Sequence, residues 1–272
     1  MNKVIGFYSH IPLSIYKGKI YTPSFIGKYL DKLAISSNQL NIYGHIVDFN
    51  KTDQDYCLKS NKINFISFGL KRNSIFRLLF GFVYFLNLKK SKIDHMIVRS
   101  PSPLSLWFRV FFKKNKLHYL LVADEKEGAI NKKINGFRDL IIKYFLLFSD
   151  LALKKCVSGT KSFVNSKALF TKYNKCSDVI LVSTSNLEKN DYISKLNFEF
   201  YSPIRLLYVG RLDLSKGILE TLEAVKLLNS SGIKCHYNIV GWDDSSGNNK
   251  KIIINKIQKL KISNLVKLSG RV

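Results

Sequence analysis

One stretch of the chain, residues 204–219 with the sequence IRLLYVGRLDLSKGIL, constrains the possible folds more than any other. Its first part, 204–209, is a short apolar run bounded by Pro203 and Gly210, which fits a buried parallel strand better than an exposed alternating one. The segment after Gly217 predicts a helix, because its apolar residues recur on one helical face: Ile218, Leu219, Leu222, Val225 and Leu228. This order of strand, loop and helix predicts an α/β fold.

Two basic residues, Arg211 and Lys216, flank the start of this predicted helix. A helix start offers unpaired N–H groups and partial positive charge, so these side chains would complete a site for an anion such as a phosphate or diphosphate. Arginine can bind two oxygens at once, whereas lysine acts as a mobile point charge. The alternative is that both are solvated loop charges in a basic chain, and their spacing alone leaves both interpretations open.

Three motifs in this part of the chain resemble one enzyme family. GRLDLSKG at 210–217 follows an apolar strand and resembles the donor-site motif of family-4 glycosyltransferases, enzymes of the GT-B fold. IVGWDD at 239–244 and NLVKLSGRV at 264–272 resemble the next two strand ends of the same domain, in the same order and at similar spacing. In the second motif Trp242 follows Gly241, where the family typically has an acidic residue.

The resemblance implies a GT-B-like α/β architecture with two domains. We expect an N-terminal, Rossmann-like, doubly wound acceptor-side domain over 1–185, a linker region over 186–203, and part of a C-terminal nucleotide-sugar-binding domain over 204–272. Three strand candidates and two helices follow residue 203, where a complete nucleotide-binding half has roughly six strands. The chain is therefore expected to be truncated within its second domain, and an inactive family member is an alternative to an active one.

The resemblance also implies a reaction and its donor. The expected enzyme is a retaining hexosyltransferase that uses a nucleotide-diphosphate sugar, with a lipid-linked or saccharide acceptor, in the biosynthesis of bacterial surface polysaccharide, lipopolysaccharide, capsule or glycolipid. It implies no cofactor and no essential metal, and we assign no catalytic residue. The residues that match the diphosphate-binding motif are Gly210, Arg211, Lys216 and Gly217, and the weaker donor-side candidates are Gly18 and Gly241.

Two further strand ends supply candidates for the acceptor side. The predicted strands 94–99 and 117–123 end in RSPSP and ADEKEG, and open α/β sheets bind ligands at such carboxyl ends. Arg99 and Asp124 are therefore weak acceptor-side candidates. The family often has a histidine before the acidic residue, and Ala123 stands in that place here. Solvation at the surface is the alternative for both side chains.

The rest of the first half has the pattern of alternating strands and helices. The strongly apolar segment 71–90 predicts a helix with basic ends, 10–22 predicts a loop, and Ser166 predicts a helix N-cap. The other predicted strands are 4–9, 42–49, 63–68, 162–165 and 178–182, and the other predicted helices are 25–33 and 137–148.

The charge of the chain indicates an anionic partner. Lysine and arginine number 44 against 19 acidic residues, a net charge of +25, which predicts attraction to nucleic acid, anionic lipid or phosphorylated substrates. Aromatic residues interleaved with the basic ones favour an anionic membrane surface. We expect no nucleic-acid partner, since no known nucleic-acid-binding motif is present. A basic, non-enzymatic module that binds membrane surfaces is the alternative function.

Segment 71–90 is the sharpest indication of a membrane surface, and a core helix is its alternative. Its face could reach lipid headgroups together with residues of the next helix: Trp107, Phe108, Phe111, Phe112, Lys113 and Lys114. No signal peptide is evident and no apolar run approaches the ~20 residues of a membrane span, so we expect a cytoplasmic protein, peripheral at the inner face of the membrane. The four scattered cysteines predict reduced thiols rather than a zinc site or disulfides.

Overall fold

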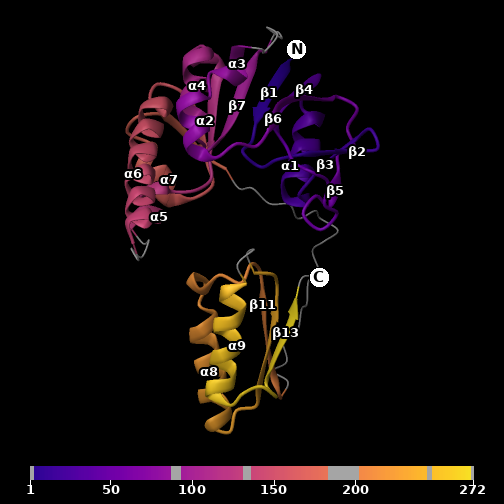
Figure 1. Cartoon of the computed structure of the whole chain (residues 1–272), viewed down its shortest axis with the longest axis vertical. Coiled ribbons are helices and arrows are strands. Elements are labelled where there is room, and N and C mark those ends of the chain that lie inside the picture. Colours follow the sequence, from indigo (N-terminus) through magenta and orange to yellow (C-terminus); the bar gives the residue numbers. More distant parts are fainter. Residues whose placement is uncertain (1–2, 87–92, 131–135, 183–201, 244–246, 271–272) are drawn as a thin grey trace. The chain divides into compact units, whose positions relative to one another are not determined.

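A computed structural model describes residues 3–86, 93–130, 136–182, 202–243 and 247–270 (Figure 1). The chain forms two compact units, Met1–Lys189 and Asn190–Val272. The linker predicted at 186–203 lies outside the described residues, except for Ser202 and Pro203. Each unit is Rossmann-like, with a parallel sheet and helices packed on it, so the predicted α/β class is confirmed.

The first unit is built on a seven-stranded parallel sheet with the order β10-β9-β8-β7-β1-β4-β6. The chain runs from β1 through β4 to β6 on one side and then returns to β7 on the other side of β1. The order therefore reverses between β1 and β7, which makes the sheet doubly wound. The strands are β1 (Val4–Tyr8), β4 (Gln39–Ile46), β6 (Ile63–Leu70), β7 (His95–Ser100), β8 (Leu117–Leu121), β9 (Lys161–Val164) and β10 (Asp178–Leu181).

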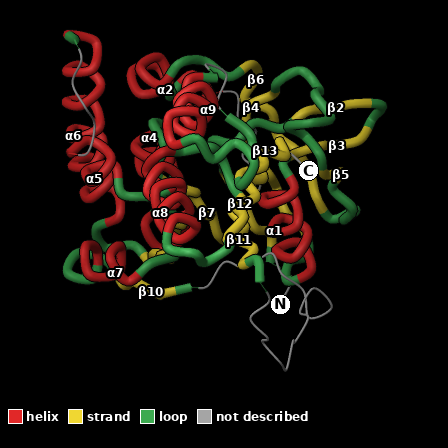
Figure 2. The backbone as a smooth tube through the Cα atoms, turned by 90° about the horizontal axis from the view of Figure 1, so that it is seen from below, coloured by secondary structure: helices red, strands yellow, loops and turns green. Residues whose placement is uncertain are grey.

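Helices cover both faces of this sheet (Figures 1 and 2). The side chains of successive strand residues therefore pack into two different hydrophobic cores, one on each face. Phe7 packs in the core with α1, whereas the next residue, Tyr8, packs in the larger core with α3, α4, α6 and α7. This alternation follows from the two-residue period of a strand. The helices are α1 (Ser24–Ile35), α2 (Ser74–Phe80), α3 (Val83–Leu86), α4 (Ser105–Phe111), α5 (Glu125–Ile130), α6 (Phe137–Val157) and α7 (Lys167–Tyr173), with a 3-10 turn η1 (Lys114–Lys116).

Three local expectations were wrong. The loop predicted at 10–22 contains a hairpin of β2 (Ser14–Tyr16) and β3 (Lys19–Thr22), to which β5 (Tyr56–Cys57) is added. In the described part of the single helix predicted over 71–90 there are two helices, α2 and α3. Gly81 lies between them, so close to Trp107 that an added Cβ would be 2.3 Å from the indole Cδ1. Helix α6 continues nine residues beyond the predicted 137–148.

The second unit is a three-stranded parallel sheet with the order β11-β12-β13, with two helices on one face (Figure 1). The other face of β11 is open, with Leu207 65% and Val209 72% exposed, so the strand is parallel but not buried on both faces as predicted. The elements are β11 (Ile204–Val209), the 3-10 turn η3 (Leu214–Lys216), α8 (Ile218–Ser230), β12 (Cys235–Val240), α9 (Asn248–Leu260) and β13 (Val266–Gly270).

A backbone contact joins the ends of the three strands in this unit. Gly241 packs so tightly on the end of β11 that an added Cβ would lie 1.7 Å from the carbonyl oxygen of Gly210. The N–H of Gly241 donates to the carbonyl of Gly270 at 2.7 Å, and the N–H of Gly210 donates to Val240 at 3.0 Å. A residue with a side chain at 241 would therefore force the strand ends apart.

We expect Gly241→Ala to lower the free energy of unfolding of the second unit by about 3 kcal/mol, the upper end for overpacking, because neither backbone segment can move freely. Gly232→Ala is the matched control, since Gly232 also has a positive φ, 83°, but no atom within 4 Å of an added Cβ. It should lower that free energy by only about 1 kcal/mol. Hydrogen exchange of the β11, β12 and β13 amides measures both, and equal losses would contradict the steric explanation.

Candidate functional site

The loop between β11 and α8 carries the predicted donor-site residues. Leu212 is 4% exposed and anchors the loop in the core of the second unit. Its N–H donates to the carbonyl of Trp242 at 2.8 Å, and the Tyr208 hydroxyl donates to the carbonyl oxygen of Arg211. The backbone at Arg211 is therefore held from two sides while its side chain is exposed.

Asp213 shapes the second half of this loop. Its Oδ1 accepts from the N–H of Ser215 at 3.0 Å and from the Ser215 hydroxyl at 2.7 Å, which starts the turn η3. These hydrogen bonds lower the pKa of Asp213, and the charges of Arg211 and Lys216 add to the effect. Gly217 then turns the chain into α8 with φ 76°, a left-handed conformation that glycine adopts without strain.

Arg211 and Lys216 both project from this loop into solvent. Within the described residues, neither side chain has a hydrogen bond or ion pair, because the one acidic group of the loop is engaged by Ser215. No side chain caps the start of α8, whose N-cap is Gly217. Two free cations beside an uncapped helix start are suited to an anion, and their role in binding a diphosphate remains a prediction.

The glycines that were predicted on the donor side have local structural reasons. Gly210 and Gly241 form the tight contact between the ends of β11 and β12 described above. Gly18 lies far from them in sequence, in the β2–β3 hairpin of the first unit. Lys17 and Gly18 form its two-residue turn with φ of 48° and 71°, the pairing that favours glycine at the second position.

Arg99 lies at the end of β7, across the switch point from His10, which follows β1. The two side chains approach to 3.5 Å between Arg99 Nη1 and His10 Nε2. Burial, followed by the charges of Arg99, Lys71 and Arg77, lowers the pKa of His10 to about 4, so its ring is neutral at pH 7. His10 was not among the predicted site residues, although its place directly after the first predicted strand could have identified it.

Asp124 follows β8 and is engaged by a lysine. Lys172 Nζ lies 2.6 Å from Asp124 Oδ1 and also contacts Asp150, whose side chain is only 4% exposed. Partial burial would raise the pKa of Asp124, but hydrogen bonds from Lys172 and the N–H of Glu127 outweigh it and lower that pKa. No hydrogen bond or ion pair within the described part of the chain joins Asp124 to Arg99, the other acceptor-side candidate.

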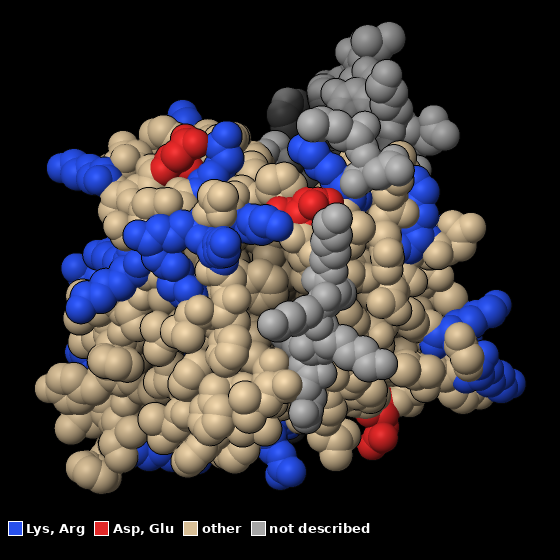
Figure 3. Space-filling view, turned by 90° about the horizontal axis from the view of Figure 1, so that it is seen from above, with Lys and Arg blue, Asp and Glu red and all other residues tan. Residues whose placement is uncertain are grey.

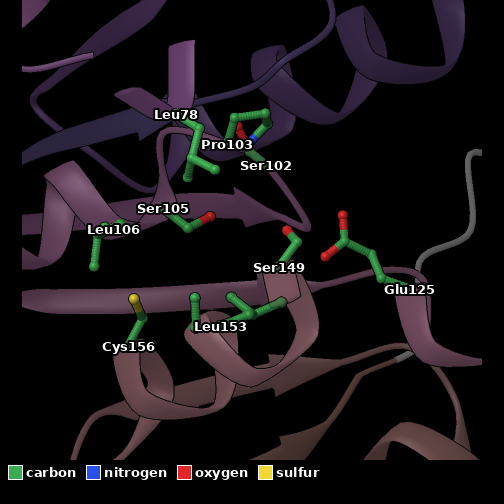
Figure 4. Close-up of a pocket in the computed structure, with 10 residues that line it drawn as sticks. Leu78, Ser102, Pro103, Ser105, Leu106, Glu125, Ser149, Leu153 and Cys156 are labelled. Atoms are coloured by element: carbon green, nitrogen blue, oxygen red, sulfur yellow. The ribbon is translucent and has the colours of Figure 1, made fainter. Parts of the chain in front are cut away.

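The neighbouring carboxylate, Glu125, faces a narrow pocket between α2, α4 and α6 (Figure 4). Burial raises the pKa of Glu125, and its Oε2 is buried with no hydrogen-bond partner among the described residues. The pocket offers about 10 Å³ to the centre of a water molecule, which is room for about one water. Its polar lining is supplied by Glu125, Ser102, Ser105 and Ser149. Glu125 was not predicted, because nothing in the sequence distinguishes it from Asp124 as the carboxylate that lines a pocket.

No group of three histidine, cysteine, aspartate or glutamate side chains in the described ranges is placed to hold a metal ion. The four cysteines are free thiols, Cys156 and Cys235 buried and Cys57 and Cys176 half-buried.

The fold, built from two Rossmann-like units, is similar to the GT-B fold of solved glycosyltransferase structures. Residues 193–272 match the profile of the family Glycosyl transferases group 1. Together, the profile match and the fold support a glycosyltransferase. The chain has no match among curated proteins.

Solved structures with this fold align over nearly the whole chain. HepE of Anabaena, solved in complex with UDP and glucose, has 14% sequence identity and a TM-score of 0.60, covering 100% of this chain and 70% of HepE. WaaG, a glycosyltransferase involved in lipopolysaccharide biosynthesis, has 12% identity and a TM-score of 0.56, covering 98% and 70%. A glycosyltransferase of Rickettsia africae has 16% identity and a TM-score of 0.54, covering 100% and 69%. These identities are low, so the likeness establishes the fold.

We expect Lys172→Met to lower the free energy of unfolding by about 3 kcal/mol, because it leaves the buried Asp150 and the half-buried Asp124 without their shared cation. Lys154→Met is the matched control: Lys154 is 38% exposed and lies 3.7 Å from Asp150, so its loss should amount to less than about 1 kcal/mol. Urea denaturation measures both, and equal losses would exclude the proposed arrangement.

The ion pair of Lys172 with Asp124 also predicts that the free energy of unfolding depends on pH. The folded pKa of Asp124 is lowered, so its contribution to stability is present above the unfolded pKa of about 3.9 and is lost as the pH falls through the folded pKa. The difference in unfolding free energy between wild type and Lys172→Met should therefore be full at pH 7 and shrink below about pH 4. Urea denaturation across this range tests the sign, and a difference that grew with acidity would refute it.

Proposed function

We propose that this chain transfers a hexose-type sugar from a nucleotide-diphosphate sugar to a saccharide or lipid-linked saccharide acceptor, with retention of configuration, as a family-4 glycosyltransferase. The observation that carries the proposal is the pair of unpaired cations, Arg211 and Lys216, on an anchored loop at the start of α8. This loop lies within the segment that matches the Glycosyl transferases group 1 profile. The UDP and glucose bound by HepE support the donor class.

The physical requirement of such a reaction is to stabilise the departing diphosphate, on which negative charge accumulates as the glycosidic bond breaks. The loop is suited to this task because its backbone is fixed before any ligand binds, by Leu212, Asp213 and the carbonyl of Trp242. Preorganised cations and helix N–H groups need little rearrangement when the charge develops. WaaG acts in lipopolysaccharide biosynthesis, which supports an acceptor in surface polysaccharide assembly.

We expect Arg211→Ala and Lys216→Ala each to weaken UDP binding by about 10- to 100-fold, the size of one to two charge-assisted hydrogen bonds. Calorimetry with UDP and GDP measures the binding and identifies the preferred base. Transfer of a radiolabelled sugar from the nucleotide sugar to membrane acceptors should fall in parallel. Lys226→Ala, an exposed lysine of α8 outside the loop, is the matched control and should change neither. Unchanged UDP binding in both loop variants would show that this loop does not bind the diphosphate.

We further propose that the first unit rests on an anionic membrane surface. Helix α2 exposes a row of large apolar side chains: Ile75 (54%), Phe76 (38%), Leu79 (58%) and Phe80 (47%). Phe111 of α4 is also exposed (45%), whereas Phe108, which the sequence placed in the same group, is fully buried. Basic side chains predominate over acidic ones on the face shown in Figure 3. Apolar side chains that insert and cations that attract anionic headgroups are the two components of interfacial binding.

None of the described helices has both the length and the apolar composition needed to cross a membrane. The membrane contact proposed here involves the surface of α2 and needs no such helix.

We expect the double substitution Leu79→Glu with Phe80→Glu to reduce partitioning onto vesicles of phosphatidylcholine and phosphatidylglycerol by about tenfold or more, since it removes insertable apolar area and adds like charge to the anionic surface. Leu227→Glu, 68% exposed on α8 of the second unit, is the control and should leave binding unchanged. Flotation measures the bound fraction. Equal effects of the two changes would show that α2 is not the contact.

A further inference from the structure

Basic residues gather at one edge of the first unit's sheet. The neighbouring strands β7, β1, β4 and β6 carry Arg99, His10, His45 and Lys71 at or directly after their carboxyl ends (Figure 1). Helix α2, which follows β6, adds Arg77. Because parallel strands end at a common edge, these five groups come from distant parts of the sequence to one region, beside the switch point between β1 and β7.

Arg77 is a buried cation whose hydrogen-bonding capacity is mostly unused. It is 5% exposed, and its Nη2 donates to the hydroxyl of Ser74 at 3.2 Å. Its Nε and Nη1 are buried and make no hydrogen bond of good geometry among the residues that the structure describes, and the polar group that Arg77 acts on most directly is the phenol of Tyr8, which carries no negative charge. A buried charged donor without an acceptor is strongly unfavourable. These two nitrogens therefore call for an acceptor from outside the described protein atoms.

His45 and Tyr84 present further unpartnered polar atoms beside Arg77. His45 is fully buried, with its ring 5.2 Å from that of Tyr84 and 5.8 Å from that of Phe68. Both ring nitrogens of His45, the hydroxyl of Tyr84 and Nδ1 of His10 make no hydrogen bond of good geometry within the described ranges, and the nearest polar backbone to the His45 ring is that of Gly69. Buried polar atoms are nearly always hydrogen-bonded, so this concentration in one region indicates a ligand rather than chance.

The charges that act in this region all have one sign. Burial, followed by the charges of Arg77 and Lys71, lowers the pKa of His45 to about 4. Besides burial, the same two cations and Arg99 lower the pKa of His10. None of the groups that shift these two pKa values is acidic, so the positive charge of Arg77 is not balanced by a carboxylate there. The two neutral rings can each still donate one N–H.

We propose that Arg77, His45 and His10 bind a phosphate group in the first unit, and, on the basis of the proposed glycosyl transfer, that this phosphate belongs to the acceptor. A phosphate offers several strong acceptor oxygens, which match the two free guanidinium nitrogens and the histidine and tyrosine donors. Its charge would balance Arg77. The site is built from residues of the first unit and shares no residue with the Arg211 loop.

The decisive experiment measures binding of inorganic phosphate to an Arg211→Ala/Lys216→Ala background, which removes the loop of the second unit as a competing site. Histidine ring signals followed by NMR should shift for His10 and His45, with His236 of the second unit as the internal reference. Adding Arg77→Met should weaken phosphate binding by about 10- to 100-fold. Arg138→Met, an exposed arginine on α6, is the matched control and should leave it unchanged. Equal phosphate affinity with and without Arg77→Met would overturn the proposal.

Thermal stability separates a binding role from a structural one. If Arg77 serves the ligand, Arg77→Met in phosphate-free buffer should unfold at the same or a higher temperature than wild type, because an unbalanced buried charge has been replaced by an apolar side chain. The rise in melting temperature that phosphate gives to wild type should be absent from the variant. A variant that melts lower than wild type and keeps the phosphate-dependent rise would assign Arg77 a structural role. His45→Phe, which keeps the aromatic packing, provides the same comparison should Arg77→Met not fold.

Two sources of the phosphate can be distinguished with the same proteins. A soluble hexose phosphate that competes with inorganic phosphate would identify a free sugar phosphate. Competition only by vesicles of phosphatidylcholine with phosphatidic acid, and not by vesicles with phosphatidylglycerol of equal charge, would identify a lipid-borne phosphate monoester.

The phosphate site and the proposed glycosyl transfer can fail separately. Transfer activity that falls on substitution of Arg211 but not of Arg77 would refute the phosphate site alone. Phosphate binding that depends on Arg77 in a protein that binds no nucleotide would refute the transferase alone.

Discussion

Parallel pairing of β7, β1, β4 and β6 is the constraint on which the first unit depends. Parallel strands need long crossover connections, so residues that end neighbouring strands are far apart in sequence and meet at one edge. Arg99 and His10 are 89 residues apart and yet approach to 3.5 Å for this reason. The edge is also where backbone groups leave the ladder, which gives side chains room for ligands that the buried sheet interior cannot offer.

The second unit uses a tighter version of the same constraint. Gly241 and Gly210 bring two strand ends into backbone contact, and the hydrogen bond from Leu212 to Trp242 extends that contact into the loop. Fixing the loop backbone has a direct chemical consequence. Arg211 and Lys216 can remain unpaired and exposed because the loop is held by Leu212 and Asp213, not by ion pairs of its cations.

The sequence predicted those parts that depend on local pattern. Individual strands were predictable from short apolar runs such as 63–68, whereas the doubly wound order was expected from the family resemblance. The cap of α7 was predictable at Ser166, whose hydroxyl accepts from the N–H of Leu169 at 3.3 Å. The hairpin at β2 and β3 was missed because runs of three and four residues are too short for periodicity. The close approach of Gly81 to Trp107 could not be predicted, because only the tertiary fold brings these two residues together. The burial of Arg77 could not be predicted either, because it depends on the tertiary fold: Arg77 is buried although it lies in a helix that exposes several apolar side chains.

Two kinds of charge arrangement share the carboxyl edge of the first sheet, and their difference bears on function. Near β8, Lys172 lies between Asp124 and Asp150, so each of these carboxylates has a cation partner within the protein itself. Near β1 and β4, Arg77 has buried nitrogens without acceptors, and the groups that act on His45 bring no carboxylate. A chain that can satisfy a buried lysine with two carboxylates on one side of a sheet does not need an unbalanced arginine on the other for stability. The imbalance is therefore better explained by a ligand that brings the missing negative charge than by packing.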